Sequence, residues 1–114
     1  MRRSASVLIA DAIEAAEAIG AFVVGATLDD YASNRMMRSA TERELLIIGE
    51  ALNAVEGACP DARERVAHLG RVVGLRNRLA HGYDTIDDAM VWSIAREDIP
   101  PLLAELRDWL ADLV

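Results

Sequence analysis

The chain has 114 residues, a formal net charge of −7 at pH 7 and one cysteine, Cys59. This length predicts a single domain over residues 1–114, and the lone cysteine excludes an internal disulfide, as is typical of a reducing intracellular compartment. The acidic balance argues against a broad nucleic-acid-binding surface, because such a surface would be basic. No stretch approaches the roughly 18 apolar residues of a membrane span, so we expect a cytoplasmic protein.

The N-terminal part predicts one long helix over residues 5–24. Apolar side chains recur there at spacings of three and four, which places them on one helix face. This expected inner face comprises Leu8, Ala12, Ala15, Ile19 and Phe22. We expect Gly25 to end the helix, and Thr27 then starts a turn in which Asp30 stands at the spacing of a capping box.

A second long helix is predicted over residues 33–56, and it carries two apolar stripes. Such a pattern indicates a helix covered on two sides, by the rest of the bundle and by another subunit. The first stripe is Leu45, Ile48, Leu52 and Val55, and the second is Ile47, Ala51, Ala54 and Ala58. The segment GACPD, residues 57–61, is expected to break this helix.

Two shorter helices are expected next. The first covers residues 61–68, and Gly70 separates it from a helix that carries Leu75 and Leu79 and ends at Gly82.

Two more helices complete the chain. One covers residues 86–97, and the last begins near Asp98, Pro100 and Pro101, since prolines favour the first turn of a helix. The inner face of the last helix is Ile99, Leu102, Leu106, Trp109 and Leu113, and Trp92 is also expected in the core. No alternating pattern typical of strands occurs. The sequence therefore predicts an all-α antiparallel bundle of four or five helices joined by short loops.

The stretch RNRLAHGYD, residues 76–84, is the candidate site. It ends a locally basic segment in which five arginines (63, 65, 71, 76 and 78) face one acid, Glu64. On an ideal helix Arg76 and His81 lie roughly 140° apart and do not converge. Gly82 could unwind the last turn and swing His81 round, or a two-fold axis could place two copies of the segment in one shared cleft.

Arginine and histidine in one groove suit RNA cleavage. The ribose 2′-OH is the nucleophile, so the reaction needs a base, an acid for the leaving 5′-oxygen and positive charge at the phosphate. Histidine can serve as either acid or base, and arginine offers a fork of donors to phosphate oxygens. A purely structural alternative is that Arg76 and His81 only complement the end of a helix. His68 is assigned no role, and no metal or cofactor is expected.

Three blocks of sequence resemble one family. RNRLAHGY resembles the R-x4-H-x-Y signature of HEPN domains, more narrowly of the HepT type found in toxin–antitoxin pairs. The block ERELLIIGEALNAV, residues 42–55, is similar to the long second helix of that family. The block IDDAMVWSIAREDIPPLLAEL, residues 86–106, is similar to its C-terminal part. The resemblance covers about residues 5–110.

The resemblance implies a homodimer formed through the side that bears the motif, and a metal-independent endoribonuclease toxin of a type II or type VII pair. Arg76 and His81 would be catalytic, with Arg76 on the phosphate and His81 in acid–base chemistry. Asn77, as an orienting hydrogen-bonder, and Arg78 would support them. The implied partner is a minimal nucleotidyltransferase antitoxin that silences the toxin by transferring AMP from ATP to Tyr83.

The acids that follow the motif favour a rival interpretation. Asp84, Asp87 and Asp88 place negative charge close to where RNA would bind, which weakens phosphate contacts. The alternative is a non-catalytic subunit that docks a minimal nucleotidyltransferase and binds its substrate or nucleotide. A third hypothesis is a dimeric bundle with a structural role alone.

Overall fold

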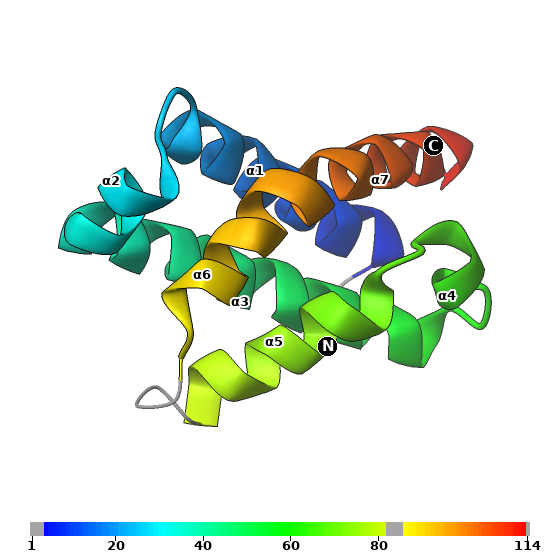
Figure 1. The fold of residues 1–114 in the computed structure, drawn as a ribbon. Helices are drawn as coiled ribbons and strands as arrows, with labels where there is room; N and C mark the ends of the chain where they lie inside the picture. The colour runs from blue at the N-terminus through cyan, green and yellow to red at the C-terminus, as the bar shows by residue number, and fades with distance from the viewer. Residues whose placement is uncertain (1–3, 82–85, 114) are drawn as a thin grey trace.

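The computed structural model describes residues 4–81 and 86–113, and every regular element within them is helical (Figure 1). The predicted all-α fold is therefore confirmed for this part of the chain. The elements in order are α1 (Ala5–Val23), α2 (Leu28–Ser33), α3 (Arg35–Ala58), α4 (Ala62–Arg65), α5 (Leu69–His81), α6 (Asp88–Ser93), the π-helical turn η2 (Ile94–Asp98) and α7 (Ile99–Leu113). No helix among the described residues is both long and apolar enough to cross a membrane.

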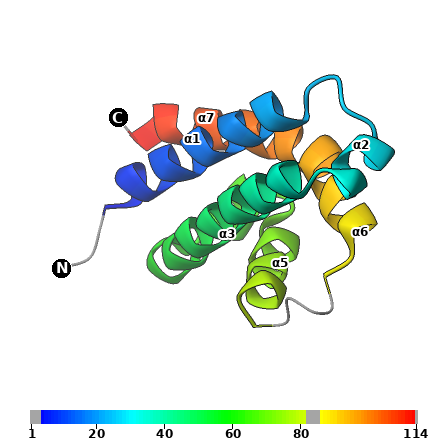
Figure 2. The same cartoon turned by 90° about the vertical axis from the view of Figure 1, so that its left-hand side faces the viewer.

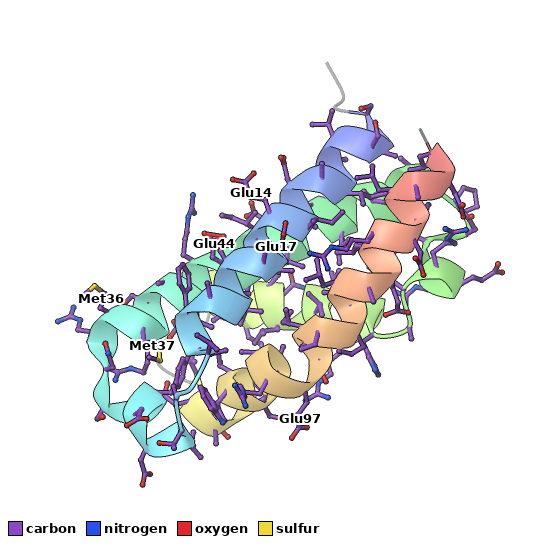
Figure 3. The ribbon with its side chains drawn as sticks, turned by 90° about the horizontal axis from the view of Figure 1, so that it is seen from above. Glu14, Glu17, Met36, Met37, Glu44 and Glu97 are labelled. Atoms are coloured by element: carbon purple, nitrogen blue, oxygen red, sulfur yellow. The ribbon has the colours of Figure 1, made fainter. Side chains whose placement is uncertain are left out.

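Four long helical segments form the bundle, namely α1, α3, α5 and the continuous run from α6 to α7. Each runs opposite to the segment before it, and α2 and α4 lie at opposite ends (Figure 1). Helix α1 packs between α3 and α7, and α3 packs between α1 and α5 (Figure 2). This arrangement confirms the predicted antiparallel bundle.

Helix α1 has the predicted extent to within one residue. The Ser4 hydroxyl caps its first turn by accepting from the Val7 amide. Gly25 follows its end with a φ of 73°, in the left-handed region that glycine tolerates best. Because α1 contacts both α3 and α7, its buried face is wider than the predicted one, and Phe22 is 37% exposed. The buried residues are Ile9, Ala12, Ala15, Ala16, Ile19 and Val23.

The predicted turn after α1 is in fact a short helix. The Thr27 hydroxyl accepts from the Asp30 amide at 3.1 Å, and the Asp30 carboxylate accepts from the Thr27 amide at 3.0 Å. This complete capping box starts α2. Asn34 ends α2, and its side chain caps α3 by accepting from the Met37 amide at 3.0 Å. The second long helix therefore begins at Arg35 rather than at residue 33.

The two apolar stripes of α3 have different environments. The first stripe is fully buried. In the second stripe Ala51 is buried and Ile47 is half-buried, whereas Ala54 and Ala58 are exposed. A single copy of the chain therefore covers the first stripe and only part of the second.

The segment between α3 and α5 contains less helix than predicted. Helix α3 ends at Ala58, inside the predicted break at residues 57–61, and α4 is four residues long where residues 61–68 were expected. Gly70, the predicted separator, lies inside α5. The chain turns before it instead, where the Ala67 amide donates to the Glu105 carboxylate of α7 at 2.9 Å. That hydrogen bond satisfies a backbone donor that lies outside both helices.

The predicted helix over residues 86–97 and the last helix form one continuous run. They are joined by η2, in which the Ile99 amide donates to the Ile94 carbonyl five residues back. A π turn is wider than an α turn. It ends one residue before Pro100 and Pro101, whose rings would crowd the preceding carbonyl groups of a regular α-helix. The predicted start of the last helix near the prolines is confirmed, since α7 begins at Ile99, but the π turn joins it to the preceding helix without a loop.

Helix α7 buries most of its predicted inner face, namely Ile99, Leu102, Leu106 and Trp109. Leu113, in its last turn, is 45% exposed. Just before α7, the η2 residue Asp98 is buried and its Oδ2 lies 3.1 Å from Nη1 of Arg71 on α5. This ion pair ties α5 to the π turn.

A polar cluster lies where α2, α3 and α6 meet. Tyr31 is fully buried, and its ring centroid lies 5.4 Å from that of Trp92, which is half-buried rather than fully in the core. Burial raises the pKa of the Tyr31 hydroxyl, and the Glu42 and Asp88 carboxylates raise it further. Burial also raises the pKa of Glu42; Asp88 adds to this rise and the Arg38 guanidinium opposes it. The cluster therefore disfavours the charged form of Glu42.

We predict that Glu42→Gln raises the melting temperature at neutral pH, by about 2 °C, with a gain that fades toward pH 4. Because the folded-state pKa of Glu42 is raised, its contribution to stability is fully present below the unfolded pKa and is lost as pH rises through the folded pKa. Glutamine has no proton to lose and stays neutral throughout this pH range. Thermal unfolding from pH 4 to 8, with Glu14→Gln as the charge-matched control, checks this. A variant that is less stable than wild type at every pH would contradict it.

Candidate functional site

The candidate residues lie on α5, at the edge of the face that packs against α3. Val72 and Leu75 are buried in that face, and Arg76 beside them is only partly exposed. Asn77 and Arg78 are exposed. The buried residues of α5 recur at helical spacing and face α3. The polar residues between them therefore lie along the edge of the contact between the two helices.

A glycine on α3 sets how closely Arg76 approaches that helix. A Cβ atom added to Gly49 would lie 2.3 Å from Cβ and 2.9 Å from Cγ of Arg76, and 3.3 Å from the Val72 carbonyl oxygen. Real Cβ atoms do not come so close to other side chains, so only glycine allows this crossing. The aliphatic stem of Arg76 therefore rests directly on the α3 backbone.

Within residues 4–81 and 86–113, the Arg76 guanidinium has two polar neighbours. Its Nη1 donates to Asn77 Oδ1 at 2.7 Å, and its Nη2 lies 3.9 Å from Oε1 of Glu50 on α3. Its Nε is buried and has no hydrogen-bond partner among these residues. The head group is therefore oriented by one neighbour on its own helix and one on the helix it packs against.

The other predicted residues are spread along α5. Arg78 Nη1 contacts Met90 Sδ of α6 at 3.4 Å, so this side chain extends away from Arg76. His81 is the last residue of α5, and the position of its side chain lies outside the described part of the structure, as do Gly82, Tyr83 and Asp84. Since α5 stays helical through His81, Arg76 and His81 of one chain are separated by roughly 140° around the axis. The backbone of α5 is therefore not unwound up to His81.

The acids expected to oppose RNA binding have local partners. Asp87 caps α6 by accepting from the amides of Ala89 and Met90, at 2.9 Å and 3.4 Å. Asp88 Oδ2 lies 3.9 Å from Arg38 Nε. The negative charge of these two carboxylates is thus partly balanced by groups of the protein itself.

The arginines that precede the motif are also paired. Arg63 Nε lies 2.5 Å from Glu56 Oε2, and Arg65 Nη2 lies 2.6 Å from Asp112 Oδ2. With Arg71 bound to Asp98, the three arginines that come before Arg76 in this segment each contact a carboxylate. The locally basic segment is therefore mostly neutralised before the motif is reached.

Comparison with known proteins shows the family to which the chain belongs. The family model described as Ribonuclease HepT-like matches residues 12–108, which include α3, α5 and the whole motif. The chain belongs to the HepT-like ribonuclease family.

Relatives of this HepT-like chain extend over nearly its whole length. A protein of Methanocaldococcus jannaschii named "Putative RNase" is 33% identical over 108 residues, which cover 93% of this chain and 96% of the relative. A second protein of that organism, with the same kind of name, is 26% identical over 114 residues, or 98% and 92% of the two chains. "Probable ribonuclease HepT" of Thermococcus cleftensis is 28% identical over 102 residues, or 90% and 92%. No solved structure matches.

Two residues of the site, Gly49 and Glu50, escaped prediction from the sequence of this HepT-like protein. The sequence feature that could have drawn attention to them is Gly49 itself. It lies in the interior of a long amphipathic helix, where glycine costs about 1 kcal/mol of stability relative to alanine. A glycine kept in such a place indicates a close backbone approach. Which helix approaches, and which side chain lies on it, follows only from the packed structure.

We predict that Gly49→Ala lowers the free energy of unfolding by about 1–2 kcal/mol, since overpacking against Arg76 outweighs the gain in helix propensity. Urea unfolding at a fixed protein concentration measures this. Gly20→Ala is the matched control, because Gly20 is an exposed helical glycine with nothing within 4 Å of its added Cβ. It should leave stability unchanged or raise it. If Gly49→Ala behaves like the control, the close crossing is not a constraint.

Proposed function

We propose that this HepT-like protein is a metal-independent endoribonuclease that uses Arg76 and His81. The observation that carries the proposal is the family match over residues 12–108, which spans the complete motif and the α3 segment that holds Arg76. The half-buried, oriented guanidinium of Arg76 supports a role on phosphate, because a prepositioned donor fork loses little freedom on binding.

In the proposed reaction the ribose 2′-OH attacks the adjacent phosphorus, and the bond to the 5′-oxygen breaks. The products are a 2′,3′-cyclic phosphate and a 5′-hydroxyl. His81 exchanges the protons, as base toward the 2′-OH or as acid toward the leaving oxygen. Arg76 stabilises the additional charge on the phosphorane. Asn77 keeps the guanidinium in place, and Arg78 adds positive charge nearby.

The proposed active unit is a homodimer, with the motifs of two chains in one cleft. One chain places Arg76 and His81 roughly 140° apart on α5, so Arg76 of one chain would act with His81 of the other. The exposed part of the second α3 stripe, Ala54 and Ala58, offers small apolar residues for such contacts.

The decisive experiment is RNA cleavage in excess EDTA by protein expressed without any partner. Wild type should cut RNA and leave 2′,3′-cyclic phosphate ends, and His81→Ala should reduce the rate at least about 100-fold, since it removes the acid–base group. Native mass and circular dichroism of the variant control for dimerisation and folding. Undiminished cleavage by His81→Ala would remove His81 from the mechanism.

The same experiment distinguishes the proposed ribonuclease from the main alternative, a non-catalytic binding subunit. If neither wild type nor variant cuts RNA while both remain folded dimers, the domain is better described as a binding subunit. It would then dock a minimal nucleotidyltransferase and hold its substrate or nucleotide through Arg76.

The proposed regulation is AMP transfer to Tyr83 by a partner nucleotidyltransferase, as in toxin–antitoxin pairs of this type. The phenolic oxygen attacks the α-phosphorus of ATP, the bond to the β-phosphate oxygen breaks, and pyrophosphate leaves with the phenolic proton passing to solvent. The chain has two tyrosines, and Tyr31 is fully buried against Trp92, which supports Tyr83 as the acceptor. The attached phosphodiester would bring negative charge beside Arg76 and compete with RNA for it.

We predict that Tyr83→Phe still cuts RNA but is not silenced by the partner with ATP. Intact mass should show AMP addition to wild type and none to the variant, with Tyr31→Phe as the matched control that keeps the addition. An equal mass gain in wild type and Tyr83→Phe would place the modification on another residue.

A further inference from the structure

The two members of the Arg76–Glu50 pair differ in how firmly they are held. Arg76 is the fixed member, because its stem rests on Gly49, its Nη1 is bonded to Asn77 and its side chain is 28% exposed. Glu50 is the mobile member, because its side chain is 57% exposed. When a third group approaches the guanidinium, Glu50 is therefore the group that moves.

Glu50 can move because more than half of its side chain is exposed to solvent. The carboxylate can turn into water and leave Arg76 without unfolding either helix. Asn77 can keep its hydrogen bond to Arg76 when phosphate binds, because a neutral amide oxygen and a phosphate can accept from different N–H groups of one guanidinium.

We propose that Glu50 is an affinity-determining residue of the site, a carboxylate that competes with RNA phosphate for the Arg76 guanidinium. The inference rests on the proposed function. A phosphate and a carboxylate both seek the donor fork of arginine, and both carry negative charge. RNA binding at Arg76 therefore includes the displacement of Glu50, and the affinity is lowered by the strength of that pair.

The size of the effect follows from the geometry. The Nη2–Oε1 distance of 3.9 Å and the exposure of Glu50 describe a solvent-screened pair. Pairs of this kind contribute about 0.2–1 kcal/mol, which corresponds to roughly 1.4- to 5-fold in a binding constant. Glu50 thus tunes RNA binding and does not block it.

The test measures binding of a short 2′-O-methyl RNA, which has no free 2′-OH and cannot be cut by the proposed reaction. Glu50→Gln should bind it roughly 1.4- to fivefold more tightly than wild type at about 0.1 M salt. Glu44→Gln, on the same helix and with the same change of net charge, is the matched control and should change binding by less. Both substitutions are then repeated in an Arg76→Ala background.

The double-mutant cycle decides the cause. Loss of the Glu50→Gln gain in the Arg76→Ala background supports competition at Arg76. A gain that persists without Arg76, or one no larger than that of Glu44→Gln, overturns the inference while the proposed function stands. Absence of RNA binding in wild type and Glu50→Gln alike overturns both.

Discussion

The close crossing of α3 and α5 is the constraint on which the candidate site depends. Gly49 removes the one atom that would separate the helices, and the stem of Arg76 occupies the space. The head group is held by its hydrogen bond to Asn77 on its own helix, and the exposed carboxylate of Glu50 lies opposite. Nearer the start of α5, the ion pair of Arg71 with the buried carboxylate of Asp98 ties the same helix to the π turn. The helix is held at two points, so its polar border keeps a defined orientation relative to the core.

The charge distribution reconciles an acidic chain with a proposed RNA site. Three arginines before the motif are bound to carboxylates from α3, α7 and η2, and two acids after it cap a helix or pair with Arg38. Most charges near the motif therefore serve the fold. In this proposal a few well-placed hydrogen-bond donors contribute most to RNA binding. The general electrostatic attraction of a basic surface contributes less.

Much of the fold could be predicted from the sequence because helix periodicity is a local signal. The buried stripe of α3 and the inner face of α7 were found in this way. The predictions were wrong where the same local sequence pattern is compatible with two different backbone structures. The Thr27–Asp30 capping box was expected to form a turn but starts a helix, and the segment before Pro100 is a π turn continuous with α7 where two separate helices were expected.

The candidate site was predictable only in part, for a related reason. The motif on α5 could be recognised as a sequence pattern, and the contact between Asn77 and Arg76 lies within one helix. The roles of Gly49 and Glu50 depend on how two helices cross, and residues 27 positions apart in the chain carry no local sign of that contact. The position of Tyr83 lies outside the described residues.

The π turn η2 also bears on which changes of chain length the C-terminal run can accept. A π turn holds about one residue more than an α turn, so the wide turn takes up an extra residue while α6 and α7 keep their apolar residues toward one core. Loss of one residue within Ile94–Asp98 could therefore be absorbed by closing the π turn to an α turn. Loss of one residue inside α7 has no such outlet and would rotate the rest of its apolar stripe by about 100°.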